Sequence, residues 1–268
     1  DQCSSLGSIT RLATSAPSLI NAILYPDWQS ILTTTITVPL NTIVSYQNAG
    51  NGTTYAGLDI NESIDASSAD LTFTLNDNGT EYSVTNCPTF VSGTIDVPST
   101  HLDTSQSPDE LPVTAIGDNA FENCQSLTSI TLPDSVASIG RRAFYNCENA
   151  TSITIGSSSN LTSIGKTAFA LCSRLTSINI PDAVTFIENY TFHRCTSLTN
   201  VTIPDNVTSI GDTAFFYCTS MTSINIPDGV TSIGADALRS CFSLPSITIP
   251  DSVTSIGNFA FSYCTSLT

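Results

Sequence analysis

A repeat of 23 residues dominates the sequence from Leu127 to the end of the chain. The cysteines of this part follow one another at steps of 23, 25, 23, 23, 23 and 23 residues: Cys124, Cys147, Cys172, Cys195, Cys218, Cys241 and Cys264. Three positions before them stand Phe121, Phe144, Phe169, Phe192, Phe215, Leu238 and Phe261. So many columns in one phase do not arise by chance, and the chain must fold as a stack of equivalent units.

The consensus of one unit is LxxIxIPxxVxxIGxxAFxxCxx, and six full copies run from Leu127 to Ser266. The LxxIxI stretch contains a predicted short strand that alternates inward and outward, and Pro-Asp then predicts a turn. The valine and the second isoleucine predict another extended segment. We expect the glycine after it to supply backbone angles that other residues resist. The spacing of Ala143, Phe144 and Cys147 predicts a short helix on the convex side.

One unit of this size cannot bury a core, but stacked units cover each other's faces, which is the logic of a solenoid. Two copies are irregular. Two extra residues between Ile155 and Leu161 replace the Pro-Asp turn, and Glu188 stands where the other copies have glycine. A seventh copy begins at Leu267, so we expect the repeats to continue beyond Thr268.

The IP, IG, AF and Cys columns at this period resemble the BspA-like (Treponema pallidum-type) leucine-rich repeats, closely over residues 113–268 and more loosely from about residue 71. The resemblance implies a curved α/β repeat solenoid with a right-handed leucine-rich-repeat coil. It also implies a surface or secreted protein, often one that takes part in adhesion or binds host proteins. The family has no common catalytic residues to transfer.

Three segments follow from this division of the chain. Residues 113–268 form the repeats, and residues 67–112 form an N-terminal cap with a degenerate first repeat and a β-hairpin, for which Asn78-Gly79 is the turn signal. Residues 1–66 lie outside the repeat and have no assigned fold. They are either an extension of the cap or a separate small domain.

Composition excludes several classes of function. Charged residues make up only 11% of the chain, the net charge is −16, and the polarity comes from 39 Thr and 38 Ser. This balance excludes the basic patch that nucleic-acid binding needs and electrostatic docking on anionic lipid. No apolar run approaches the roughly 20 residues of a membrane span, so we expect no membrane insertion in this segment.

The sequence offers little chemistry for catalysis or metal binding. CxxC pairs are absent, and we expect the repeat cysteines to be buried core thiols. Cys3 and Cys87 stand outside that column and form a possible disulfide. The aspartates Asp134, Asp182, Asp205, Asp228 and Asp251 either form repeated Asx turns, which we favour, or share calcium. With only His101 and His193 and no catalytic motif, we expect no enzyme and no cofactor.

Two surfaces are candidates for binding. The outward strand positions predict a polar, uncharged concave face, or an inert solvated one: Ser129, Thr131, Ser152, Thr154, Ser177, Asn179, Asn200, Thr202, Ser223, Asn225, Ser246 and Thr248. The convex positions vary most between copies and either bind a partner or pack between helices: Arg141, Arg142, Tyr145, Lys166, Tyr190, His193, Arg194, Phe216, Tyr217, Phe242, Phe259 and Tyr263. Phe186 replaces the usual serine of its column and is either a binding feature or compensation for crowding.

These observations favour a non-enzymatic, extracellular or cell-surface binding module whose partner is a host or matrix protein or a surface glycan. The alternative is a structural stalk or spacer that displays another domain. Hydrolase activity from the N-terminal segment ranks last, because no motif supports it. The identity of the ligand and the oligomeric state do not follow from the sequence.

Overall fold

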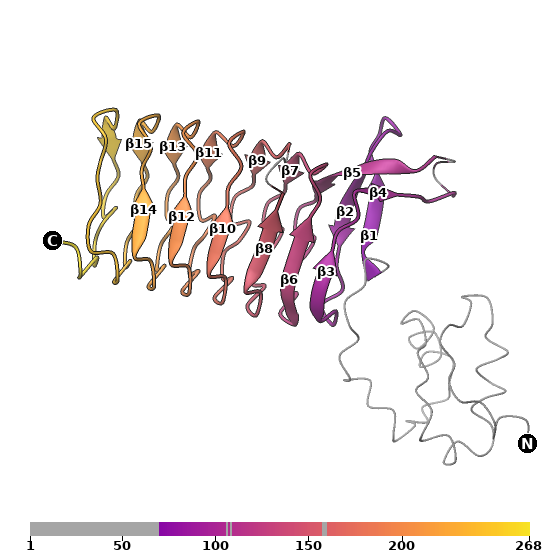
Figure 1. Ribbon diagram of the computed structural model, residues 1–268, viewed down its shortest axis with the longest axis horizontal. Coiled ribbons are helices and arrows are strands. Elements are labelled where there is room, and N and C mark those ends of the chain that lie inside the picture. The colour runs from indigo at the N-terminus through magenta and orange to yellow at the C-terminus, as the bar shows by residue number, and fades with distance from the viewer. Residues whose placement is uncertain (1–69, 106, 108, 157–159) are drawn as a thin grey trace, which may run out of the picture. The chain divides into compact units, whose positions relative to one another are not determined.

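The computed structural model describes residues 70–105, 107, 109–156 and 160–268, all within the unit Asn61–Thr268. The two interpretations of residues 1–66, as an extension of the cap or as a separate small domain, concern residues outside the described part. Within the described part, the chain winds into a β-solenoid of about 6 turns with repeats of ~23 residues (Figure 1). We name each coil by its cysteine, so that the Cys195 coil spans residues 175–197.

The longer strands of successive coils stack in parallel and define the long-strand face. Their ladders are β3 (Gly93–Asp96), β6 (Leu127–Leu132) and β8 (Ser152–Ile155), and β10 (Ser177–Asn179), β12 (Asn200–Thr202) and β14 (Ser223–Asn225). Register is one repeat per coil, as in the pair Ile130 and Ile153. The isoleucines point into the core, whereas the residues on either side of them point outward, as a half-buried strand requires.

A second set of strands, each of two residues in the repeats, defines the short-strand face. One ladder joins β2 (Tyr82–Asn86), β5 (Leu111–Ile116), β7 (Ser138–Ile139) and β9 (Ser163–Ile164). The other joins β11 (Phe186–Ile187), β13 (Ser209–Ile210), β15 (Ser232–Ile233) and β16 (Ser255–Ile256). A turn separates the two faces in each coil, closed for example by the Val207 amide donating to the Pro204 carbonyl at 3.0 Å.

The predicted hairpin is present at the N-terminal end of the described residues. Strand β1 (Thr72–Leu75) pairs antiparallel with β2, and Gly79 takes a φ of 68° in the turn between them. Strand β4 (Thr100–His101) pairs antiparallel with β5. The His101 ring stacks on Phe73 at 4.0 Å and meets the buried Tyr82 ring edge-on at 4.8 Å. These elements cover the first coil of the stack.

The prediction of a convex helix was wrong. Residues from the Ile-Gly glycine to the cysteine form consecutive turns, and the described residues contain no α-helix. In every coil the second and sixth residues after the glycine position have positive φ, as at Arg142 (55°) and Asn146 (60°). Such angles interrupt a helix. The amides of this turn face bond to the next coil, as when Phe144 N–H donates to the Ala168 carbonyl at 2.8 Å.

The reason given for the Ile-Gly glycine was also wrong. None of these glycines has a positive φ. A Cβ added to Gly165 would lie 2.6 Å from the Arg141 nitrogen, and one added to Gly234 would lie 2.5 Å from the Asp212 nitrogen. The glycine is therefore required because the preceding coil approaches too closely for any side chain, and the unusual backbone angles fall on its neighbours.

The core is a column of stacked rings and thiols. Phe121, Phe144, Phe169, Phe192 and Phe215 are fully buried, and successive rings lie 5.1–5.4 Å apart. Each repeat cysteine donates from Sγ to a carbonyl of the preceding coil, as Cys218 does to Phe192 at 3.2 Å. The eight cysteines of the described residues are buried and unpaired with one another. Burial raises the pKa of Cys218, and it raises that of Cys241 to about 12.

Threonine hydroxyls form ladders of hydrogen bonds between adjacent coils. One column of threonines lies at the second position of the repeat, next to the long strands. Thr151, Thr199 and Thr222 in this column each donate from Oγ1 to the carbonyl of the equivalent threonine one coil earlier. Thr208 and Thr231 do the same beside the short strands. These hydroxyls find their acceptors in the preceding coil, so the polarity of these two columns does not depend on charged side chains.

Both strand ladders are interrupted between the Cys172 and Cys195 coils. Within the described residues, no strand pairing joins β8 to β10 or β9 to β11, although these strands are neighbours in Figure 1. This is where Glu188 replaces glycine, at a position whose Cβ meets the preceding backbone in the other coils. The turn face continues across the junction, because Phe169 N–H donates to the Thr191 carbonyl at 2.9 Å.

Candidate binding surfaces

The long-strand face presents the predicted polar array. Thr131, Thr154, Asn179, Asn200, Thr202, Asn225 and Thr248 are exposed, and Ser129 is half-buried. Asn200 lies beside Ser223, and Thr202 beside Asn225, in the parallel register of β12 and β14. Asp96 in β3, in register with Thr131, adds one charged side chain to the N-terminal end of the face, and the array is divided into two blocks by the junction between β8 and β10. It offers hydrogen-bonding groups but no side-chain anchor.

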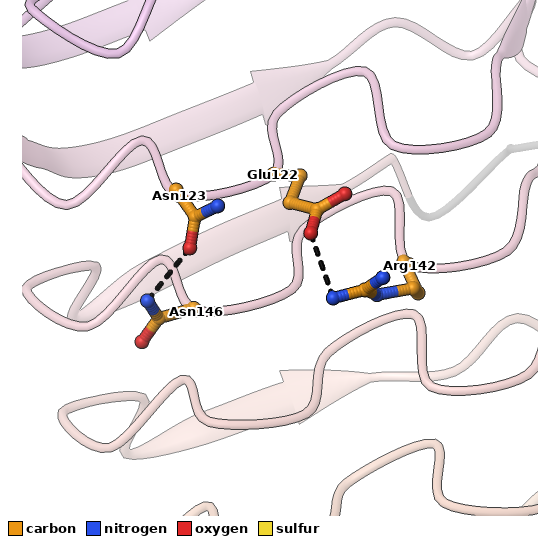
Figure 2. Close-up of polar contacts among 4 residues, drawn as sticks. All are labelled: Glu122, Asn123, Arg142 and Asn146. Carbon is orange, nitrogen blue, oxygen red and sulfur yellow. Dashed lines mark hydrogen bonds and ion pairs between the residues drawn. The ribbon is translucent and has the colours of Figure 1, made fainter.

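The turn face of the N-terminal coils pairs its polar side chains internally. Arg142 forms an ion pair with Glu122 at 2.7 Å, and Asn146 Nδ2 donates to Asn123 Oδ1 at 2.8 Å (Figure 2). The Arg142 guanidinium also lies 4.2 Å from the centroid of the Tyr145 ring. These groups already have partners in the neighbouring coil, which leaves little on this part of the surface to recognise another molecule.

The same columns hold aromatic residues in the Cys195, Cys218 and Cys241 coils. We call this set the turn-face aromatic cluster: Tyr190, His193, Phe216, Tyr217 and Phe242. His193 stacks on Phe216 at 5.1 Å. Tyr190 lies 5.7 Å from His193, and Phe242 lies 5.7 Å from Tyr217. The cluster is continuous across three coils, and Tyr190 and Tyr217 remain 45% and 38% exposed.

Two arginines flank the cluster. Arg194 is exposed and lies 5.7 Å from the centroid of the Tyr217 ring, and it forms no ion pair within the described residues. Arg239 lies 5.8 Å from the Phe216 centroid and pairs with Asp236 at 3.0 Å. Burial, and then the charge of Arg194, lower the pKa of His193 below its usual value, so this imidazole is neutral at pH 7.

Several of these side chains belong to residues with a strained backbone. Tyr190, Arg194 and Tyr217 have φ values of 62°, 59° and 62°. Bulky residues avoid this left-handed region of φ/ψ angles, which asparagine and glycine adopt more readily. In the N-terminal coils Asn119, Asn123 and Asn146 take equivalent places at lower cost, but Arg142, with a φ of 55°, does not. The strain is therefore common to the coils, and what distinguishes the cluster is that large aromatic side chains stand at these positions in adjacent coils.

The structure brings together only part of the predicted convex set. Tyr190, Arg194, Phe216 and Tyr217 converge with His193 and Phe242, whereas Arg141, Arg142 and Tyr145 lie on other coils. Sequence analysis missed Arg239. Its signal was its place one coil after Phe216 in the same column.

Other predicted sites are isolated or lie outside the description. Asp134, Asp182, Asp205, Asp228 and Asp251 are exposed, and each lies directly after a proline of its coil, whereas the Cys172 coil has no equivalent aspartate. In the described part of the chain no group of three or more His, Cys, Asp or Glu side chains could hold a metal ion. Cys87 is buried, but Cys3 lies outside the described residues, so their disulfide stays a prediction. The described residues contain no helix that is long and apolar enough to cross a membrane.

Comparison with known proteins finds relatives over the repeats. A family model described as a BspA type leucine-rich repeat region matches residues 99–203 and 185–268. No curated protein sequence matches the chain. A leucine-rich cell surface protein from Faecalibacterium prausnitzii is 38% identical over 74% of this chain, with a TM-score of 0.64, and this chain covers 52% of it, about half its length.

Two further solved structures are similar. A leucine-rich repeat protein from T. pallidum is 28% identical over 76% of this chain and 91% of its own, with a TM-score of 0.68. The pneumococcal vaccine antigen PcpA is 16% identical over 76% of this chain and 68% of its own, with a TM-score of 0.50, which shows a shared fold alone.

Proposed function

The chain belongs to the BspA-type leucine-rich repeat family, as its repeat columns predicted, and we propose that it is a non-enzymatic binding module of a cell-surface or secreted protein. Its role would be adhesion to a host or matrix protein or to a surface glycan. The likeness to a protein described as a leucine-rich cell surface protein supports the location. A solenoid whose faces repeat every ~23 residues supports the mode of action, because it offers a long surface for contact.

The turn-face aromatic cluster is the observation that carries this proposal. Tyr and Arg are enriched among the residues that dominate binding energy at protein interfaces. Tyr190, Tyr217 and Arg194 are exposed together on one continuous surface, and each contacts a neighbouring ring: Tyr190 meets His193 at a tilt, Tyr217 stacks on Phe216, and Arg194 lies over Tyr217. Fixed aromatic side chains lose little conformational entropy when a partner docks. The same columns in the N-terminal coils lack this property, because their polar groups pair internally.

The experiment compares partner capture by the 268-residue chain and by the double variant Tyr190→Asn/Tyr217→Asn. Asparagine fits the left-handed backbone, so the fold is retained while both rings are lost. We expect saturable binding of at least one purified extracellular-matrix protein or arrayed glycan, weakened about tenfold or more in the double variant. Thr213→Asn, in the same turn-face column as Tyr190, is the matched control and should bind like wild type.

A structural spacer is the second candidate. The ring and thiol column crosses the junction at Glu188 without a break, as the 5.4 Å stack of Phe169 on Phe192 shows. A continuous core of this kind would keep a display stalk stiff. No saturable partner for the folded wild-type chain, or equal affinity in the double variant, would contradict binding through the cluster, and the former would favour the spacer.

A further inference from the structure

A shallow groove of about 530 Å³ runs along the short-strand face of the Cys195 to Cys264 coils, and no residue of the turn-face aromatic cluster is part of its lining. Its polar lining comes from Asn189, Ser209, Asp212, Ser232, Ser255 and Asn258. Asp212 is the single ionisable residue among those that line it.

Two lining side chains are fixed, and each keeps one polar atom for a ligand. Asn189 Oδ1 accepts the Asp212 amide at 2.9 Å, which leaves Nδ2 as a donor. Asp212 Oδ1 accepts the Ala235 amide at 2.7 Å, which leaves Oδ2 as an acceptor. The link between adjacent coils therefore presents a donor and an acceptor side by side, with their orientation already set.

The serines that line the groove have hydroxyl groups that are not used in hydrogen bonds between the described coils. Thr208 and Thr231, one residue earlier in the chain, donate to carbonyls of the preceding coil. The side chains of Ser209, Ser232 and Ser255 form no hydrogen bond to any other described residue. Ser209 and Ser232 point outward from β13 and β15, since the isoleucine that follows each of them is buried, and Ser255 is exposed in β16 of the last coil.

An aromatic ring heads this column. Phe186 replaces the serine found in the other coils and is the register partner of the lining residue Ser209 of β13, so it stands next to the groove without being part of its lining. Its side chain is 53% exposed, and no ring within the described residues stacks on it. Tyr190, one residue beyond Asn189, is a second exposed ring on the same coil. An exposed apolar ring of this kind costs free energy unless a ligand covers it.

We propose that this groove binds a neutral pyranose oligosaccharide, with Phe186 as the stacking platform and Asn189 and Asp212 as the hydroxyl-recognising pair. A sugar ring has an apolar C–H face for an aromatic ring, and each of its hydroxyls both donates and accepts, so neighbouring hydroxyls match the Nδ2 and Oδ2 atoms. An anionic ligand would meet the Asp212 carboxylate and a chain of net charge −16. A wholly apolar ligand would leave the polar atoms of the lining without partners.

This inference rests on the proposed role as a binding module and narrows it to a ligand class. The test measures binding of chitohexaose, maltohexaose and laminarihexaose to the 268-residue chain by isothermal titration calorimetry. We expect at least one to bind, and Phe186→Ser to bind it about tenfold or more weakly. Serine is the native residue at the equivalent position of other coils, so this variant should fold. Asp212→Asn removes the charge, keeps the Ala235 contact and should also weaken binding, by removing the stronger, charged acceptor.

Controls separate this site from the aromatic cluster. Phe90→Ser, which removes another exposed phenylalanine, should leave hexaose binding unchanged. Phe186→Ser should leave capture of a protein partner by the turn face unchanged. Absence of binding by all three hexaoses, an unweakened Phe186→Ser variant, or tighter binding of a sulfated hexasaccharide would overturn the glycan site. Protein capture that survives such a result would leave the proposed function standing.

Discussion

Each coil has two residues with positive φ on the turn face, and these angles influence which side chains can stand there without strain. Thr213 has a φ of 59°, and a β-branched residue there is strained in a way that asparagine is not. Thr213→Asn should therefore raise the free energy of unfolding by about 1 kcal/mol. Denaturant unfolding measures this. Thr222→Asn is the control, because it removes a hydroxyl bond to Thr199 and should lower stability; equal effects of the two changes would contradict the strain argument.

The neutral imidazole of His193 links stability to pH. Its pKa in the folded chain lies below the usual 6.5, so below that pH the unfolded chain takes up the proton more readily. The stability that this group contributes is complete above pH 6.5 and is lost as pH falls through the folded pKa. His193→Phe, which keeps a ring against Phe216, should lose less stability between pH 7.5 and pH 5.5 than wild type. Parallel pH profiles for the two chains in chemical denaturation would sink this prediction.

Glycine is required after most short strands because adjacent coils lie in close contact there, and not because of unusual backbone angles. An alanine at Gly234 would place its Cβ 2.5 Å from the Asp212 nitrogen. We expect Gly234→Ala to lower the free energy of unfolding by about 1–3 kcal/mol, the cost of overpacking. Ser232→Ala, two residues earlier on the outward side, is the matched control and should change thermal or denaturant stability little. A neutral Gly234→Ala variant would show that the coils can separate freely.

Within each coil, the residues that face the core could be predicted from the sequence. The periods of Phe, Cys and Ile identified the core and the strands, because burial requires apolar residues at fixed places in every coil. The helix was mispredicted at Ala143, Phe144 and Cys147, since offsets of one, three and four fit consecutive turns as well as a helix. The aromatic cluster could be predicted only as separate residues. Its convergence depends on the stacking register of three coils, which no single repeat shows.

At the scale of the whole molecule, the described solenoid consists of two strand-paired blocks that share one core. The ladders stop on either side of the Cys172–Cys195 junction, but the turn face and the phenylalanine column continue across it. Energetic coupling in a solenoid passes only between neighbouring coils. The junction is therefore the interface where coupling should be weakest, and the binding surfaces proposed here both lie on the C-terminal side of it.

Hydrogen exchange tests this division directly. Amides of residues 177–179 and 186–188, whose strands pair with no strand of the preceding coil within the described residues, should exchange faster than those of residues 200–202 and 209–211, their equivalents one coil later. The amides of Phe169 and Leu171, bonded across the junction at 2.9 and 2.8 Å, should stay protected. Glu188→Gly removes the side chain that separates the coils, so it should slow exchange at 186–188 and raise stability. Uniform protection on both sides of the junction, or no change in Glu188→Gly, would mean that the two blocks open as one.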